Sequence, residues 1–164
     1  MATLEEWARR AVGDRLARLA RTPDELAVAI AGRDGGGLAR RPDATNWSPT
    51  EVLCHLRDTE ESFLDRLGQI VLMDGPVFAT TNPDRWAAER QYGRQDAAAA
   101  LAAFGRRRAE TLAFLDGLRP EDWRRAGRHT DSRGRRSIDD FVGVMAWHDE
   151  NHVDQLRRAL EGRA

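Results

Sequence analysis

The stretch from residue 137 to residue 160 constrains the fold most, because its apolar residues recur at the spacing of one face of an α-helix. Ser137 precedes it as a helix cap. The stripe consists of Phe141, Val144, Met145, His148, His152, Leu156 and Leu160. Imidazole is poor core material, because each ring buries at least one nitrogen that needs a partner. A helix that places two histidines on its apolar face must therefore provide a hydrogen-bond partner or a metal ion for their ring nitrogens.

A second helix is expected from Ser48 to about Leu72. Ser48 and Glu51 form the pattern of a capping box, and Trp47 can pack onto Val52 as a hydrophobic staple. The apolar face consists of Val52, Leu56, Thr59, Phe63, Leu67 and Ile70. His55 flanks this face close to the start of the helix, so a third imidazole is predicted near the core.

Two further long segments carry helical spacing. Residues 96–116 are rich in alanine, and residues 3–20 have apolar residues at near-helical intervals. A separate short helix is expected over residues 22–31, since a threonine and a proline begin it. Residues 73–95 are expected to form a long connection with a helical turn near its middle, and residues 124–136 a polar loop. With no alternating strand pattern, the economical architecture is an all-α four-helix bundle.

Composition limits the class of protein. The chain has 164 residues, 41% hydrophobic and 32% charged, which suits one folded domain spanning residues 1–164. All 26 basic residues are arginine, yet the net charge is −1 with both signs interspersed, which argues against a nucleic-acid binder. No apolar run approaches the ~20 residues of a membrane span, and residues 1–10 do not resemble a signal peptide. We expect a cytoplasmic protein with no nucleic-acid or membrane partner.

The three histidines are the candidate metal ligands. His148 and His152 lie four residues apart, one turn above each other, so both rings can reach one ion. Histidine pairs at this spacing also occur on solvent-facing surfaces, and a lone buried histidine can instead bond a carbonyl or carboxylate. His55 would join the pair only if its helix faces the last one. Three imidazoles would leave one tetrahedral position open, as in catalytic zinc sites.

Other polar residues near the histidines have weaker roles. Asp58, Asp149 and Glu150 could orient the ligand rings, although a solvated helix surface is the better interpretation of each acid taken alone. His129 lies between polar neighbours and is expected at the surface. Cys54, the single cysteine, is expected as a small buried hydrophobe rather than a reactive thiol. Trp47, Trp123 and Trp147 are expected to pack the core or the helix ends.

Two segments resemble the DinB/YfiT-like superfamily of metalloenzymes. Residues 47–58, with the sequence WSPTEVLCHLRD, are similar to its second-helix motif. Residues 148–156, with the sequence HDENHVDQL, are similar to its last-helix motif, in which two histidines four apart are followed by glutamine. The order of expected helices matches across nearly the whole chain. The chain departs from many members at Asn151, where they have histidine.

The resemblance implies an up-down-down-up bundle that holds a divalent metal, usually nickel or zinc, on His55, His148 and His152. It also implies a possible homodimer, and relatives that transfer low-molecular-weight thiols such as bacillithiol and mycothiol.

Three functions follow from this combination. The first is a metal-dependent enzyme that transfers a low-molecular-weight thiol to a small electrophilic substrate, since a metal favours the thiolate. An arginine-rich segment such as residues 124–136 could bind an anionic cosubstrate, or be a solvated loop. The second is a metal-dependent hydrolase. The third is a non-catalytic metal-binding or interaction protein of stress response, in which the ion only ties two helices together.

Overall fold

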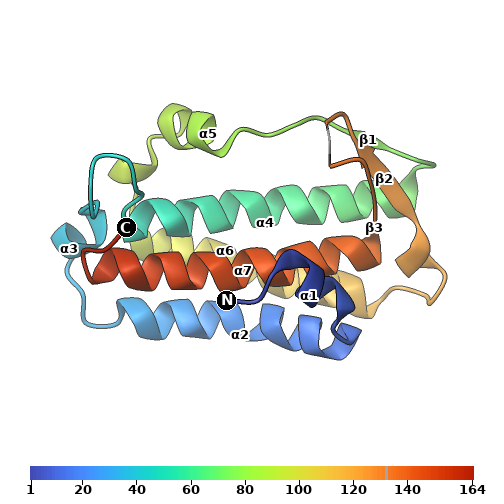
Figure 1. The fold of residues 1–164 in the computed structure, drawn as a ribbon, viewed down its shortest axis with the longest axis horizontal. Coiled ribbons are helices and arrows are strands. Elements are labelled where there is room, and N and C mark those ends of the chain that lie inside the picture. The colour runs from blue at the N-terminus through green and yellow to red at the C-terminus, as the bar shows by residue number, and fades with distance from the viewer. Residues whose placement is uncertain (132) are drawn as a thin grey trace.

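Four long helices packed side by side form the body of the molecule (Figure 1). The structure is a computed structural model that describes residues 1–131 and 133–164. The long helices are α2 (Val12–Ile30), α4 (Pro49–Leu72), α6 (Ala97–Asp116) and α7 (Ile138–Leu160). Helices α2 and α7 run in one direction and α4 and α6 in the other, which is the up-down-down-up order. This confirms the predicted all-α four-helix bundle.

The helices that carry the histidines are neighbours. Helix α4 packs against α6 and α7, and α2 packs against α7 and α6, so the four form a closed ring around the core. Capping boxes begin both histidine helices: Ser48 with Glu51 on α4, and Ser137 with Asp140 on α7. These local signals fix where each helix starts and therefore which residues face the seam between them.

Short elements precede and connect the long helices. They are α1 (Leu4–Arg9), α3 (Gly35–Ala39), α5 (Pro83–Glu89) and two turns of 3₁₀ helix, η1 (Tyr92–Arg94) and η2 (Asp122–Arg124). Helix α5 is the helical turn predicted within the long connection. It lies above α4 in Figure 1, on the side where the site described below opens.

The N-terminal prediction of one helix followed by a short one was wrong. The chain breaks after α1, and α2 then continues through Pro23. Proline lacks the N–H that would bond the carbonyl four residues earlier. In this fold the freed carbonyl of Leu19 accepts a hydrogen bond from Arg108 Nη1 at 2.9 Å. A side chain from α6 therefore replaces the missing backbone donor, which the local sequence could not indicate.

Residues 124–136 were also predicted wrongly as a loop. A small sheet of order β1-β2-β3 covers one end of the bundle, formed by β1 (Val77–Phe78), β2 (Ala126–His129) and β3 (Arg135–Ser137). Strand β1 is parallel to β2, and β2 is antiparallel to β3. Gly127 allows Phe78 to lie against β2, since a Cβ there would lie 2.3 Å from that ring. Strands this short and polar do not show the alternation of apolar and polar residues by which a strand is predicted.

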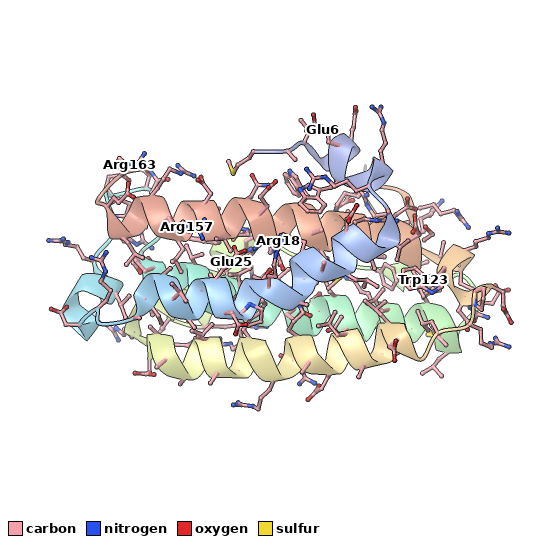
Figure 2. All side chains as sticks on the ribbon, turned by 90° about the horizontal axis from the view of Figure 1, so that it is seen from below. Glu6, Arg18, Glu25, Trp123, Arg157 and Arg163 are labelled. Atoms are coloured by element: carbon pink, nitrogen blue, oxygen red, sulfur yellow. The ribbon has the colours of Figure 1, made fainter. Side chains whose placement is uncertain are left out.

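Buried and half-buried charges join the helices through the core. Arg108 on α6 donates to Glu60 on α4 at 2.9 Å and to Asp149 on α7 at 3.0 Å, and all three side chains are buried. Nearer the surface, Glu25 pairs with Arg18 on its own helix at 2.9 Å and with Arg157 on α7 at 3.7 Å (Figure 2).

Within residues 1–131 and 133–164, no helix combines the length and the apolar character of a membrane span.

Candidate metal centre

The three predicted histidines come together at the seam between α4 and α7. His55 is buried, and His148 and His152 are partly exposed toward a pocket. One nitrogen from each ring lies within 4.8 Å of the others, and His55 Nε2 is 3.0 Å from His148 Nε2. The ring centroids of His55 and His152 are 4.5 Å apart, and those of the α7 pair 4.3 Å. The sequence could place His148 beside His152, and the fold adds His55.

Two polar side chains stand at the outer nitrogens of these rings. Gln155 Oε1 is 2.7 Å from His152 Nδ1, and Thr59 Oγ1 is 3.4 Å from His55 Nδ1. An amide oxygen only accepts, so His152 Nδ1 carries the hydrogen and Nε2 keeps its lone pair. The threonine hydroxyl can accept in the same way from His55. Both contacts favour the tautomer in which Nε2 is free to bind a cation.

Burial keeps the three imidazoles neutral at pH 7. It lowers the pKa of His55 to about 3, and repulsion from a charged His152 adds to the effect. It likewise lowers the pKa of His148 well below the usual value, with both neighbouring histidines contributing, and it lowers the pKa of His152. Neutral imidazole is the form that binds metal.

The donor set fits a divalent cation. Tetrahedral coordination with metal–nitrogen bonds of 2.0–2.1 Å places ligand nitrogens about 3.3 Å apart, and the His55–His148 separation of 3.0 Å is already close to that value. With hydrogen on the outer nitrogens, the lone pairs on Nε2 face one another, an arrangement that a cation between them relieves. His55, His148 and His152 would hold the ion, and their three nitrogens leave a fourth position open toward the pocket.

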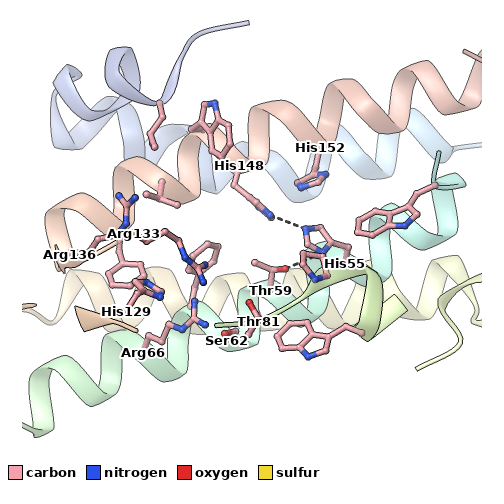
Figure 3. A pocket seen from close by; sticks show the side chains of 18 residues that line it. His55, Thr59, Ser62, Arg66, Thr81, His129, Arg133, Arg136, His148 and His152 are labelled. Carbon is pink, nitrogen blue, oxygen red and sulfur yellow. Dashed lines mark hydrogen bonds between the residues drawn. The ribbon is translucent and has the colours of Figure 1, made fainter. Parts of the chain in front are cut away.

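The pocket beside the histidines is large enough for a small molecule. It has a volume of about 550 Å³ and runs along the groove between α4 and α7 (Figure 3). Aromatic rings form much of its wall: Trp47, Phe63, Trp86, Phe141 and Trp147. Among the residues that the structure describes, no carboxylate lines it.

Comparison with known proteins places the chain in a family. The family model described as the DinB superfamily matches residues 18–156. The chain belongs to the DinB superfamily. The fold agrees with the solved structure of YfiT from Bacillus subtilis, with a TM-score of 0.84, 17% identity, and coverage of 100% of this chain and 92% of that one. That structure is described as a probable metal-dependent hydrolase with an unusual four-helix bundle topology.

Two curated relatives show lower coverage. "Putative metal-dependent hydrolase OB0782" from Oceanobacillus iheyensis is 26% identical over 112 residues, which are 67% of this chain and 63% of the relative. "Putative metal-dependent hydrolase YfiT" from Bacillus subtilis is 21% identical over 124 residues, 76% of this chain and 64% of the relative. The matched part of the chain thus spans less than two thirds of each curated relative.

The acids proposed from the sequence to orient the rings bond other groups in this DinB-superfamily protein. Asp58 is buried and accepts from Arg57, Arg90 and the hydroxyl of Tyr92. These hydrogen bonds outweigh the cost of burial and lower its pKa. Asp149 bonds the buried Arg108 and Thr22, at 3.0 and 2.6 Å.

Glu150 accepts hydrogen bonds from the N-terminal segment and not from a ligand ring. It accepts from the backbone of Ala2 at 3.1 Å and from Trp7 Nε1 at 2.9 Å. The contacts to the ligand rings come instead from Thr59 and Gln155. Gln155 stands three residues after His152, a spacing from which it could have been found.

His129 was predicted at the surface and is buried instead. Strand β2 carries it under Phe78 and Phe141, with only 3% of the residue exposed, and it lines the pocket. Trp47 and Trp147, expected as packing residues, line the pocket as well.

Cys54 is fully buried as predicted, and burial raises the pKa of its thiol to about 11.

Proposed function

We propose that this protein is a metal-dependent enzyme that transfers a low-molecular-weight thiol to a small electrophilic molecule. The observation that carries the proposal is the open side of the three-histidine cluster, which faces a pocket of about 550 Å³. A divalent cation, zinc or nickel, lowers the pKa of a thiol or water molecule that reaches it and so supplies a nucleophile at neutral pH. A purely structural ion would need no such pocket.

The chain's own residues bind and orient the reactants. The neutral histidines would hold the cation, and Thr59 and Gln155 fix the direction of two rings. Trp47, whose ring centroid is 4.9 Å from that of His55, shields this end of the pocket from water. In the reaction the thiol sulfur bonds the electrophilic carbon, the leaving group departs with its electron pair, and the thiol proton passes to water.

The absence of a carboxylate from the described pocket wall supports a thiol as the nucleophile. With its pKa lowered by a cation, a thiol would give its proton to water without a protein base, whereas metallohydrolases commonly add a carboxylate base, as in the helix motif with two histidines and a glutamate. Hydrolysis is the second candidate, and the names of both curated relatives favour it. A cytoplasmic location and a homodimer stay predictions from the sequence.

Elemental analysis of His148→Ala tests the metal site. Wild-type protein is expected to hold one equivalent of a divalent metal, and the variant is expected to lose it while its helical circular dichroism stays unchanged. Removing one of three ligands lowers the affinity, but the bundle keeps its buried core. Retained stoichiometric metal in the variant would contradict the assignment.

A reaction panel separates the two activities. Metal-loaded protein is mixed with cysteine, glutathione, coenzyme A or mycothiol and an electrophile such as chlorodinitrobenzene, and in parallel with ester and amide substrates without thiol. Thiol-dependent turnover that disappears in His148→Ala supports transfer. Metal-dependent turnover without thiol assigns hydrolysis instead, and a metal-loaded protein inactive in both arms contradicts a catalytic role for these substrates.

A further inference from the structure

The pocket has a second end, which the metal site does not use. His55, Thr59, Ser62 and Arg66 follow one another along α4 at intervals of three and four residues, and all line the pocket. Eleven residues are about 16 Å of helix rise and three turns plus about 20°, so His55 and Arg66 share one face. Figure 3 shows the three candidate ligand histidines at one end of the pocket. At the other end it shows Arg66, His129, Arg133 and Arg136.

Arg66 is a buried cation without a matching anion. It is 8% exposed, and its one hydrogen bond to the residues that the structure describes is a long contact of 3.4 Å to the carbonyl of Ala79. In the described part of the chain, no carboxylate forms an ion pair with it. Burial, together with repulsion from Arg133, lowers the pKa of Arg66, and this outweighs the attraction of Asp65 and Asp131, which are near but not in ion-pair contact. Buried charges are ordinarily paired, because removing a charge from water is unfavourable unless a partner replaces the water.

His129 adds an unpartnered polar atom to the same end. The residue is 3% exposed, and its Nδ1 is buried with no hydrogen-bond partner among the described atoms. Burial lowers the pKa of His129, and repulsion from Arg133 and Arg66 lowers it further, to about 4. His129 and Arg66, whose guanidinium has no ion pair among the described residues, thus line the same end of the pocket.

The strand beyond His129 supplies a second guanidinium. Arg136 on β3 lines the pocket and has no ion pair within the described chain, while Arg133 is already paired with Asp131 at 2.6 Å. Between the two ends, Phe63, Phe141 and Val144 give the wall an apolar side, and Thr59, Ser62 and Thr81 add hydroxyl groups to it.

We propose that Arg66, Arg136 and His129 form an anion-binding subsite, which selects small substrates carrying a carboxylate or phosphate separated by an apolar body from the reacting end. Arginine suits either oxyanion, because its planar fork donates two parallel hydrogen bonds. This inference rests on the proposed function only for the placement of the reacting end at the histidines. The subsite itself binds without metal.

Binding of phenylpropionate, phenyl phosphate and the neutral phenylpropanamide tests the subsite. Quenching of tryptophan fluorescence reports the binding, since three tryptophans line the pocket. Wild-type protein is expected to bind one or both anions and to bind the amide more weakly. Arg66→Met is expected to weaken anion binding about tenfold or more, because a charge-assisted hydrogen bond is lost. The metal content of this variant is expected to stay unchanged.

Two arginines on strand β3 give a matched control. Arg136→Met is expected to weaken anion binding as Arg66→Met does, and it carries the test if the latter does not fold. Arg135→Met changes the exposed neighbour, which does not line this pocket, and is expected to bind as wild type. Equal binding of anion and amide, or wild-type anion binding by both Arg66→Met and Arg136→Met, would overturn the proposal.

His148→Ala separates this inference from the proposed function, because a carboxylate could also bind a metal ion. Anion binding retained in His148→Ala and lost in Arg66→Met places the anion at the arginine end. The reverse pattern places it at the cation and rules out the subsite. Either result stands whether or not the protein catalyses thiol transfer.

Discussion

At the scale of single residues, Gln155 is the side chain that fixes a ligand ring most directly. Its amide oxygen lies 2.7 Å from His152 Nδ1, so Gln155→Leu removes the acceptor that holds the Nε2 lone pair toward the cation. We expect metal affinity to fall about 10–100-fold, the usual effect of removing such a partner. Competition with a chromophoric chelator measures the change.

Asn151 offers the control for that measurement. It lies on the same helix and donates to the carbonyl of Trp147 at 2.7 Å, and the structure gives it no hydrogen bond to a ligand ring. Asn151→Ala should keep wild-type metal affinity. If both variants bind metal equally well, the contact between Gln155 and His152 plays no part in binding.

Residue spacing explains what the sequence could and could not reveal about the site. His148 and His152 are local, so their proximity follows from helix geometry, whereas the third histidine depends on α4 lying beside α7. Arg66 was missed although it lies on the same helical face as His55, because arginine on a helix usually reaches solvent. His129 offered no signal, since polar neighbours surround it and only the packing of β2 under Phe78 buries it.

At the scale of elements, Arg108 joins four helices. It pairs with Glu60 on α4 and Asp149 on α7, and it bonds the Leu19 carbonyl that Pro23 leaves free on α2. Removing the Arg108 side chain would leave two buried carboxylates and one backbone carbonyl without this hydrogen-bond donor.

We expect Arg108→Met to lower the free energy of unfolding by about 3–5 kcal/mol, the cost of breaking a buried pair from one side. The adjacent Arg107 has a side chain that is 38% exposed and pairs with the surface acids Glu61 and Glu110, so Arg107→Met should cost less than about 1 kcal/mol. Urea unfolding at pH 7 compares the two variants. Equal stability would show that the buried network contributes no more than a surface pair.

Elements were predictable wherever their signals were local. The capping box at Ser48 and the acid-rich start of α7 set both helix starts correctly. The break after α1 and the passage of α2 through Pro23 depend on contacts with α7 and α6, such as Trp7 with Glu150 and Arg108 with Leu19. Strand β1 joins β2 from more than forty residues away in sequence, and the local pair of β2 and β3 is too short and polar to show an alternating pattern.

At the scale of the whole molecule, the partial or full removal of four histidines from water couples folding to pH. The pKa of His55 falls to about 3 and that of His129 to about 4, and the pKa values of His148 and His152 are lowered as well. In the unfolded chain each imidazole has a pKa of about 6.5. On acidification the unfolded state therefore takes up protons first, and folding loses stability.

The metal-free protein should accordingly be most stable above about pH 6.5 and lose stability as the pH falls toward the folded-state values. A histidine that titrates only in the unfolded state contributes a slope of up to about 1.4 kcal/mol per pH unit. Urea unfolding at intervals from pH 7.5 to pH 5 measures the slope in a range where carboxylates stay ionised. His129→Asn should make it shallower while leaving the three ligands in place. A flat profile over this range would mean that the imidazoles take up protons in the folded bundle, and the neutral donor set proposed for the cation would then be wrong.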